Sequence, residues 1–188
     1  MSRIMLVDDE ANILKALRRL LGATPCTCGG TVFRLQIETF TEPEAALERA
    51  SQVPFELVLS DYRMPGMDGV AFLSAFKGLQ PDAVRLILSG YADLNALVGA
   101  INQAQIYRFL SKPWNDYELV STIAQALAYR QLTLENQHLA DQARVAQGAM
   151  SAEEWELKRL EQESPGITQV NWGPDGSVIL DPDLLEKP

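Results

Sequence analysis

The sequence predicts an α/β fold in which five parallel strands form a doubly wound sheet with helices on both faces. Two observations lead to this prediction. Apolar segments of strand length alternate with segments of helical spacing from residue 3 to about residue 130. Two of the apolar segments, 55–59 and 84–88, are almost uninterrupted, as is typical of strands that are buried on both faces of a parallel sheet.

Each element has its own signal. The first strand is the apolar run 3–7, and the helix after it, at 10–21, has apolar residues at helical spacing. Residues 22–31 are rich in Gly, Thr, Cys and Pro and predict a loop. Alternation of Phe33, Leu35 and Ile37 predicts a strand at 32–40. Thr41 is the expected cap of the second helix, at 42–50, with Pro43 in its first turn.

The remaining elements continue the alternation. Strands are expected at 55–60, 84–88 and 106–110, and helices at 70–77, 93–103 and from about residue 115 or 116. One domain of ordinary size accounts for this part of the 188 residues. The predicted division is therefore a domain at 1–130 and an extension at 131–188.

Charge separates the two parts. Residues 1–130 carry 12 basic and 14 acidic side chains, whereas residues 131–188 carry 4 basic and 11 acidic side chains. No stripe of Lys and Arg offers the electrostatic footprint that a nucleic-acid backbone requires. We therefore expect no direct binding of DNA or RNA, and expect signalling to a protein partner.

Other sequence features bear on the cellular location of the protein and on the role of its two cysteines. The first residues enter a strand pattern directly, unlike a signal peptide, and no apolar run approaches the roughly 20 residues of a membrane span. A cytoplasmic location without membrane contact is expected. Cys26 and Cys28 are one residue apart, and only His138 could join them in a metal site. They are expected to be incidental thiols in a loop.

Polar side chains follow three of the predicted strands. Asp8 and Asp9 follow the first, Asp61 ends the third, and Lys112 follows the fifth. In a doubly wound parallel sheet the carboxyl ends of the strands meet at one edge, where binding sites form. Several acids beside one amine suit a divalent cation and a phosphate group.

These residues belong to longer motifs in receiver-like order: Asp8-Asp9, Asp61 with the segment 62–69 after it, Ser89-Gly90, and 109–113 with Lys112-Pro113. Residues 1–130 therefore resemble the receiver domain of bacterial two-component response regulators, which has a flavodoxin-like fold. The loop after Asp61 and the segment 107–114 further resemble receivers attached to cyclic-dinucleotide phosphodiesterases and to hydrogenase-type transcriptional regulators.

The resemblance implies a metal site. Asp61 is implied as the phosphoryl acceptor that forms an acyl phosphate. Asp9 and Asp61 would ligate Mg²⁺ directly, the backbone carbonyl of Arg63 would be a third protein ligand, and Asp8 would hold ordered waters. Mg²⁺ prefers few carboxylates together with waters and substrate oxygens, so this inventory suits it.

The resemblance also implies a switch. Lys112 would pair with the acids and then with the phosphoryl group, and the Ser89 hydroxyl would donate to a phosphoryl oxygen. Phe109 would swing inward on phosphorylation, coupled to Ser89, although core packing is the alternative for an aromatic residue in an apolar strand. The implied phosphodonor is a sensor histidine kinase or a small molecule.

The extension is expected to begin as a continuation of the last helix through 131–149. A heptad pattern predicts a two-stranded coiled coil and hence a homodimer; the alternative is a helix that folds back on its own domain. Ser151 and Glu154 predict a capping box for a further helix through Glu163. Segments 167–172 and 177–180 around a Gly-Pro-Asp-Gly turn predict a terminal β-hairpin.

Two functions from different classes follow. The first is a signalling module that accepts a phosphoryl group on Asp61 and passes a conformational change to a partner or within a dimer, without turning over a substrate. The alternative is a small Mg²⁺-dependent phosphohydrolase with an aspartate nucleophile. Phosphohydrolases of the haloacid dehalogenase type place Asp-x-Asp on the first strand, whereas this chain has Asp8-Asp9.

Overall fold

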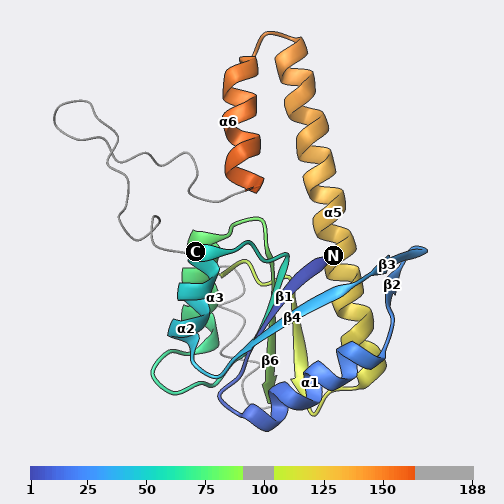
Figure 1. The fold of residues 1–188 in the computed structure, drawn as a ribbon, viewed down its shortest axis with the longest axis vertical. Coiled ribbons are helices and arrows are strands. Elements are labelled where there is room, and N and C mark those ends of the chain that lie inside the picture. Colours follow the sequence, from blue (N-terminus) through green and yellow to red (C-terminus); the bar gives the residue numbers. More distant parts are fainter. Residues whose placement is uncertain (91–103, 164–188) are drawn as a thin grey trace, which may run out of the picture.

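The computed structural model describes residues 1–90 and 104–163. Five strands form one parallel sheet in the order β4-β1-β5-β6-β7 (Figure 1). Their bounds are β1 Ser2–Val7, β4 Leu35–Phe40, β5 Leu57–Asp61, β6 Val84–Gly90 and β7 Arg108–Lys112. The predicted five-stranded, doubly wound parallel sheet is confirmed.

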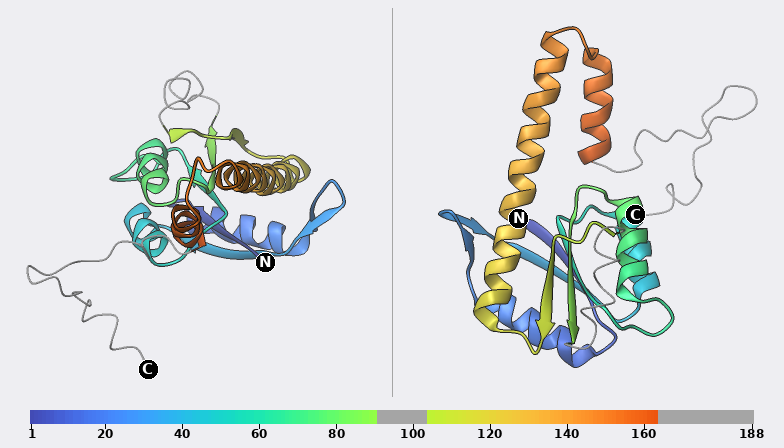
Figure 2. Two further views of the ribbon diagram at one scale, coloured as in Figure 1. Left: turned by 90° about the horizontal axis from the view of Figure 1, so that it is seen from above. Right: turned by 180° about the vertical axis from the view of Figure 1, so that it is seen from behind.

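Helices cover both faces of this sheet (Figures 1 and 2). One face packs against α1 and the first half of α5, and the other packs against α2 and α3. The bounds are α1 Ala11–Ala23, α2 Pro43–Gln52, α3 Gly69–Leu79, α5 Asp116–Ala146 and α6 Ala152–Glu163. The helix predicted at 93–103 lies outside the described residues.

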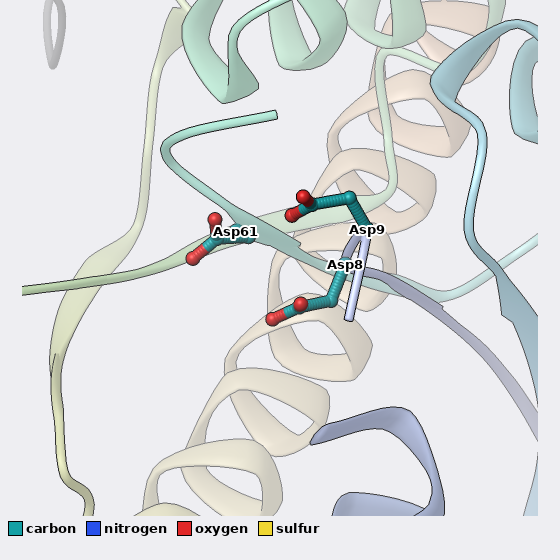
Figure 3. Close-up of side chains that lie close together, drawn as sticks. All are labelled: Asp8, Asp9 and Asp61. Carbon is teal, nitrogen blue, oxygen red and sulfur yellow. The ribbon is translucent and has the colours of Figure 1, made fainter. Parts of the chain in front are cut away.

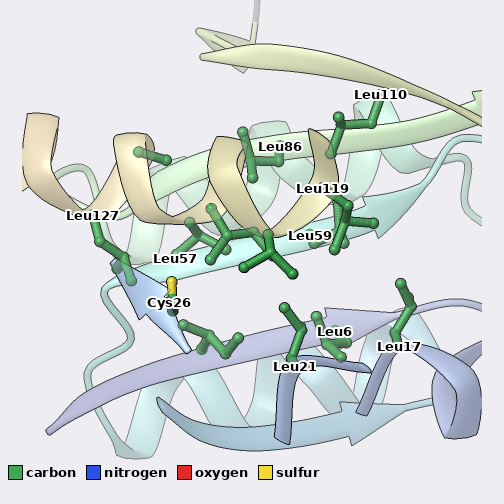
Figure 4. Close-up of a cluster of buried hydrophobic side chains, with 14 of the residues drawn as sticks. Leu6, Leu17, Leu21, Cys26, Leu57, Leu59, Leu86, Leu110, Leu119 and Leu127 are labelled. Carbon is green, nitrogen blue, oxygen red and sulfur yellow. The ribbon is translucent and has the colours of Figure 1, made fainter. Parts of the chain in front are cut away.

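Alternation along the strands divides the core into two clusters. In β1, Ile4 and Leu6 face α1 and α5, whereas Met5 and Val7 face α2 and α3, and all four side chains are at most 1% exposed. Figure 4 shows the first cluster, in which leucines of the central strands meet Leu17 and Leu21 of α1 and Leu119 and Leu127 of α5. Burial on both faces explains why the central strands have near-continuous apolar sequences.

The prediction of a loop at 22–31 is wrong in part. It contains β2 (Cys26–Cys28), which pairs antiparallel with β3 (Thr31–Phe33), and the predicted strand at 32–40 is divided between β3 and β4 at Arg34. Gly29 and Gly30 turn the hairpin with φ of +57° and +84°, a conformation that a two-residue hairpin loop requires and that glycine adopts readily. β2 packs against α5.

This hairpin gives Cys26 a structural position. Its side chain is 2% exposed and belongs to the core cluster beside α5 (Figure 4). Burial, with a smaller contribution from Cys28, raises the pKa of the Cys26 thiol to about 11. Both thiols are free. The expectation of two incidental loop thiols is therefore wrong for Cys26, which fills space in the core.

The C-terminal extension is a helical hairpin. α5 continues beyond the sheet, and α6 runs back beside it (Figures 1 and 2). The predicted capping box is present: the Ser151 amide donates to the Glu154 carboxylate at 2.8 Å, and the Glu154 amide donates to the Ser151 hydroxyl at 3.0 Å. The terminal hairpin predicted at 167–180 lies outside the described residues.

Contacts between α5 and α6 combine rings and charges. The rings of His138 and Trp155 lie 5.6 Å apart between centroids. Asp141 is 5% exposed and accepts from Lys158 of α6 and, at 3.0 Å, from Arg144. The hydrogen bond from Lys158 is the main cause of the lowered pKa of Asp141. None of the helices in the described part of the chain is long and apolar enough to cross a membrane.

Candidate functional site

Three carboxylates gather at the carboxyl edge of the sheet. Asp8 and Asp9 follow β1, and Asp61 ends β5 (Figure 3). One carboxylate oxygen from each residue lies within 4.8 Å of the others. Asp8 and Asp61 are buried, at 1% and 7% exposure, whereas Asp9 is exposed. The group is therefore open to solvent on one side and held by the protein on the other.

Strand register brings these acids together. β1 and β5 are parallel neighbours, and Val7 lies opposite Ser60, so the residues that follow them leave the sheet at the same level. Parallel strands end with their C-terminal residues at one edge, which is where sites form in this class of fold. The sequence expectation about this edge depends only on strand direction, and the structure places the acids accordingly.

Lys112 completes the group from the end of β7. Its Nζ donates to Asp8 Oδ2 at 2.7 Å and to Asp61 Oδ1 at 2.6 Å. The peptide bond between Lys112 and Pro113 is cis. One ammonium group thus bridges Asp8 and Asp61, and it belongs to a residue 104 positions after Asp8 in the sequence.

The pKa shifts describe a crowded, partly buried site. Burial raises the pKa of Asp8, against the effect of its hydrogen bonds from Lys112 and from the Glu10 amide. Burial by itself would lower the pKa of Lys112, but its bonds to Asp61 and Asp8 outweigh this, so that the pKa is raised. Lys112 therefore stays protonated and offers one positive charge to the carboxylates of Asp8 and Asp61.

The loop after Asp61 is fixed at both ends. The Arg63 amide donates to Asp61 Oδ2 at 3.0 Å, and the Gly69 amide donates to the Tyr62 carbonyl at 2.8 Å. Asp68 caps α3 by accepting from the Ala71 amide at 2.8 Å. These bonds hold the backbone beside Asp61, where the carbonyl of Arg63 is the predicted third protein ligand.

Gly69 is a positioning residue whose role the sequence did not reveal. A Cβ at this position would lie 2.0 Å from the backbone oxygen of Asp61, so only glycine permits so close an approach of α3 to the end of β5. The sequence contains one signal for this role, which is the glycine at the end of the segment 62–69 that follows Asp61. Its φ is not positive, and the requirement comes from space.

Ser89 and Phe109 lie on the two strands beyond β5. Ser89 is 1% exposed near the end of β6, and its hydroxyl donates to the Gly90 carbonyl at 3.4 Å. Phe109 of β7 is half-buried, packs against the core cluster of α2 and α3, and lies opposite Ile87, two residues before Ser89. Core packing and a switching role are both compatible with this position.

The donor set fits a hard divalent cation. All three candidate side chains offer carboxylate oxygens, which Mg²⁺ and Ca²⁺ prefer. Asp8 and Asp61 form ion pairs with Lys112, whereas Asp9 is exposed to solvent. A small number of protein oxygens on an open side suits Mg²⁺, which keeps several waters.

Comparison with known proteins places the fold in a family. The model of the response regulator receiver domain matches residues 4–124. The hydrogenase transcriptional regulatory protein HoxA of Cupriavidus necator is 36% identical over 125 residues, which are 66% of this chain and 24% of HoxA. The DNA-binding transcriptional regulator NtrC of Salmonella typhimurium is 37% identical over 128 residues, which are 68% of this chain and 25% of NtrC.

Solved structures agree with this result. The signal receiver domain of an HD domain-containing protein from Pseudomonas fluorescens is 33% identical, with a TM-score of 0.61 over 69% of this chain and 97% of that domain. An uncharacterized protein from Neptuniibacter caesariensis is 39% identical, with a TM-score of 0.63 over 72% of this chain and 93% of that protein.

This chain spans about a quarter of the length of HoxA and NtrC. Both are named as regulators of transcription, and NtrC is named as DNA-binding, so that the absence of nucleic-acid binding by this chain stays a prediction. The match over residues 4–124 and the sheet order agree with each other. The chain belongs to the response regulator receiver domain family.

Proposed function

We propose that this receiver domain accepts a phosphoryl group on Asp61 in a Mg²⁺-dependent reaction. The observation that carries the proposal is the bridge from Lys112 Nζ to Asp8 at 2.7 Å and to Asp61 at 2.6 Å, beside the exposed Asp9. Phosphoryl transfer needs an oxygen nucleophile and positive charge around the transferred group. This arrangement supplies both at one edge of the sheet.

In the proposed step, a carboxylate oxygen of Asp61 attacks the phosphorus and forms an acyl phosphate. The bond from phosphorus to the donor breaks, and its electron pair leaves with the donor, which is the imidazole of a sensor histidine kinase or a small phosphodonor. Mg²⁺, held by Asp9, Asp61 and the Arg63 carbonyl with waters at Asp8, would neutralise charge on the phosphoryl oxygens. Lys112 would exchange its bond to Asp61 for one to the phosphoryl group.

The signal would leave through β6 and β7. The Ser89 hydroxyl would donate to a phosphoryl oxygen, and Phe109 would move inward in response. Ser89 at 1% exposure and the half-buried Phe109 occupy neighbouring strands on the way from Asp61 to the surface of the domain. The output is binding to a protein partner and not turnover of a substrate, and we place it in the cytoplasm with the kinase.

A mass measurement tests the proposal. Incubation with a small-molecule phosphodonor and Mg²⁺ should add one phosphoryl group to the wild type and none to Asp61→Asn. The matched control is Asp68→Asn, because Asp68 lies in the same loop and outside the acidic group. Full labelling of Asp61→Asn would refute the assignment of the acceptor, and continuous release of phosphate would favour a phosphohydrolase.

We also propose a homodimer through the extension of α5. Seven of the eight heptad core positions lie on one side of this helix and are exposed: Gln125, Tyr129, Leu132, Asn136, Leu139, Ala143 and Ala146. The eighth, Met150, is half-buried and follows the end of the helix. Residues that face α6, such as His138 and Asp141, lie on the opposite side, at intervals of 3.6 residues per turn. α6 therefore leaves the predicted dimer surface uncovered.

Three large hydrophobic side chains are exposed on this surface. Tyr129, Leu132 and Leu139 are 53%, 58% and 55% exposed. In a parallel pair of helices Asn136 would meet its own counterpart, which fixes the register of two-stranded coiled coils. A second copy of the chain would cover the exposed side chains and would place a second Asn136 opposite the first. In such a dimer α6 would lie on the outer side of each helix.

A further inference from the structure

A cleft of about 620 Å³ lies between α6 and the edge of the receiver domain opposite the acidic group. On the domain side it is lined by the segments that lead into β5 and β6, including Phe55, Leu79 and Pro81. On the other side it is lined by Lys158 and Glu161 of α6. In Figure 1, α6 descends from the turn after α5 toward α3.

The chemistry of the cleft favours an apolar occupant. Leu79 is 39% exposed although it is a large hydrophobic residue. The charged lining residues are two cations, Arg130 and Lys158, and two acids, Asp82 and Glu161. Both cations have partners, since Arg130 donates to the Asp82 carbonyl at 3.0 Å and Lys158 donates to Asp141. A charged ligand would gain little here, whereas an apolar side chain would cover Leu79.

We infer that the chain's own C-terminal segment, residues 164–188, occupies this cleft through Trp172. Glu161 lines the cleft and α6 ends at Glu163, so the following 25 residues start beside it. Trp172 is nine residues beyond Glu163, and a chain of this length reaches about 30 Å when extended. This reach is long enough for Trp172 to enter a cleft that begins beside the end of α6.

This segment is a better occupant than a second copy of the chain for two reasons. A tethered segment has an effective concentration of the order of millimolar, which exceeds that of a second copy at ordinary protein concentrations. The other two tryptophans also have partners within the described residues, because Trp155 contacts His138 and Trp114 donates to Asp116 at 3.2 Å. Trp172 is the single aromatic residue in the sequence of the segment 164–188.

Docking would join α6 to the receiver domain. α6 packs against α5, and its lysine and glutamate reach the rim of the cleft. An apolar segment seated between α6 and Leu79 would fix the direction of the helical hairpin relative to the sheet. This inference does not rest on phosphoryl acceptance, because the cleft and Asp61 lie at opposite edges of the sheet.

Photo-crosslinking in the full chain tests the inference. p-Benzoylphenylalanine in place of Leu79 should crosslink to a peptide from residues 164–188. An equal mixture of ¹⁵N-labelled and unlabelled chains shows whether each link is within one chain, as expected, or between two. The control carries the same amino acid in place of Val32, which is 63% exposed and lines a different cavity; it should give no link to these residues.

Substitution of Trp172 tests whether this side chain anchors the segment. Trp172→Ala should lower the yield of the link about tenfold or more, because one anchoring aromatic residue commonly carries that much binding energy, and Trp172→Phe should restore much of it. Links between labelled and unlabelled chains, links to other segments alone, or an unchanged yield in Trp172→Ala would overturn the inference. Asp61→Asn should leave the yield as in the wild type.

Discussion

Lys112 is the residue that holds the acidic group together. Its ammonium group contacts two carboxylates that arrive from different strands, and these contacts raise its pKa above the ordinary value of 10.5. A lysine with a raised native pKa stabilises the fold fully below its unfolded pKa, and this contribution is lost as the pH rises through the native pKa. The contribution of Lys112 to the free energy of unfolding is therefore constant over the physiological range of pH.

Asp8 gives the site a pH dependence of its own. Burial raises its native pKa above 3.8, so the native state binds this proton more readily than the unfolded state does. The free energy of unfolding of the wild type should therefore rise relative to that of Asp8→Asn as the pH falls from 7 through the raised pKa toward 3.8. Urea unfolding in the presence of a chelator measures this difference. A constant difference would contradict it.

Magnesium should stabilise the protein through Asp9. Three carboxyl groups gathered near one point repel one another until positive charge compensates them. A ligand that binds only the native state adds about 2.7 kcal/mol at 100 times its dissociation constant. Thermal unfolding midpoints should rise with Mg²⁺ in the wild type and scarcely in Asp9→Ala.

The matched control for the magnesium prediction is Glu42→Ala. Glu42 is exposed, precedes α2 and makes no side-chain capping bond. This variant should respond to Mg²⁺ as the wild type does. Equal rises in Asp9→Ala and in the wild type would exclude a metal role for Asp9.

Gly69 should resist substitution while Gly78 should not. An added Cβ at Gly69 would lie 2.0 Å from the Asp61 carbonyl oxygen, whereas one at Gly78 would meet nothing within 4 Å. Gly69→Ala should therefore lower the free energy of unfolding by about 1–3 kcal/mol and slow phosphorylation. Gly78→Ala should be neutral or stabilising by up to about 1 kcal/mol, because alanine favours helices. Chemical unfolding of both variants decides between these outcomes.

Among the elements, the two faces of α5 beyond the sheet differ in how far they are covered. α6 covers the face that contains His138 and Asp141, and the opposite face leaves Leu132 and Leu139 more than half exposed. Contiguous exposed apolar surface of this kind marks interaction sites. The heptad pattern and the packing of α6 are thus compatible, because each uses its own side of the helix.

If the chain dimerises as proposed, the double substitution Leu132→Lys and Leu139→Lys should make it monomeric. Two facing pairs of like charges would replace apolar contacts in the proposed seam. The control is Leu157→Lys, because Leu157 of α6 is 48% exposed and lies outside that seam. Light scattering gives the mass of each protein in solution. A monomeric wild type, or a dimer that survives the double substitution, would show that the seam serves another purpose.

At the scale of the whole molecule, the features that depend on strand direction were predictable from the sequence. Alternation and apolar runs located the five strands, and their carboxyl ends then placed Asp8, Asp61 and Lys112 at one edge. The β2–β3 hairpin was missed because strands of three residues are too short for a periodic pattern to be visible. Its core residue, Cys26, was therefore assigned to a loop.

Features that depend on contacts between distant residues were not predictable. The face of α5 that α6 covers contains Asp141, whose partner Lys158 is 17 positions away in the sequence. The need for glycine at position 69 arises from a carbonyl eight positions earlier that approaches only after α3 has packed. Neither contact leaves a periodic signal in the sequence.

Locating the phosphoryl group on the chain shows whether Asp61 is the acceptor. Borohydride reduces an aspartyl phosphate to homoserine, which marks the acceptor permanently. After treatment of the wild type with a phosphodonor and Mg²⁺, tandem mass spectrometry should find homoserine at position 61, in place of Asp61, and none in the peptide that contains Asp8 and Asp9. Homoserine at position 8 or 9, or the absence of homoserine from the phosphorylated protein, would show that Asp61 is not the acceptor.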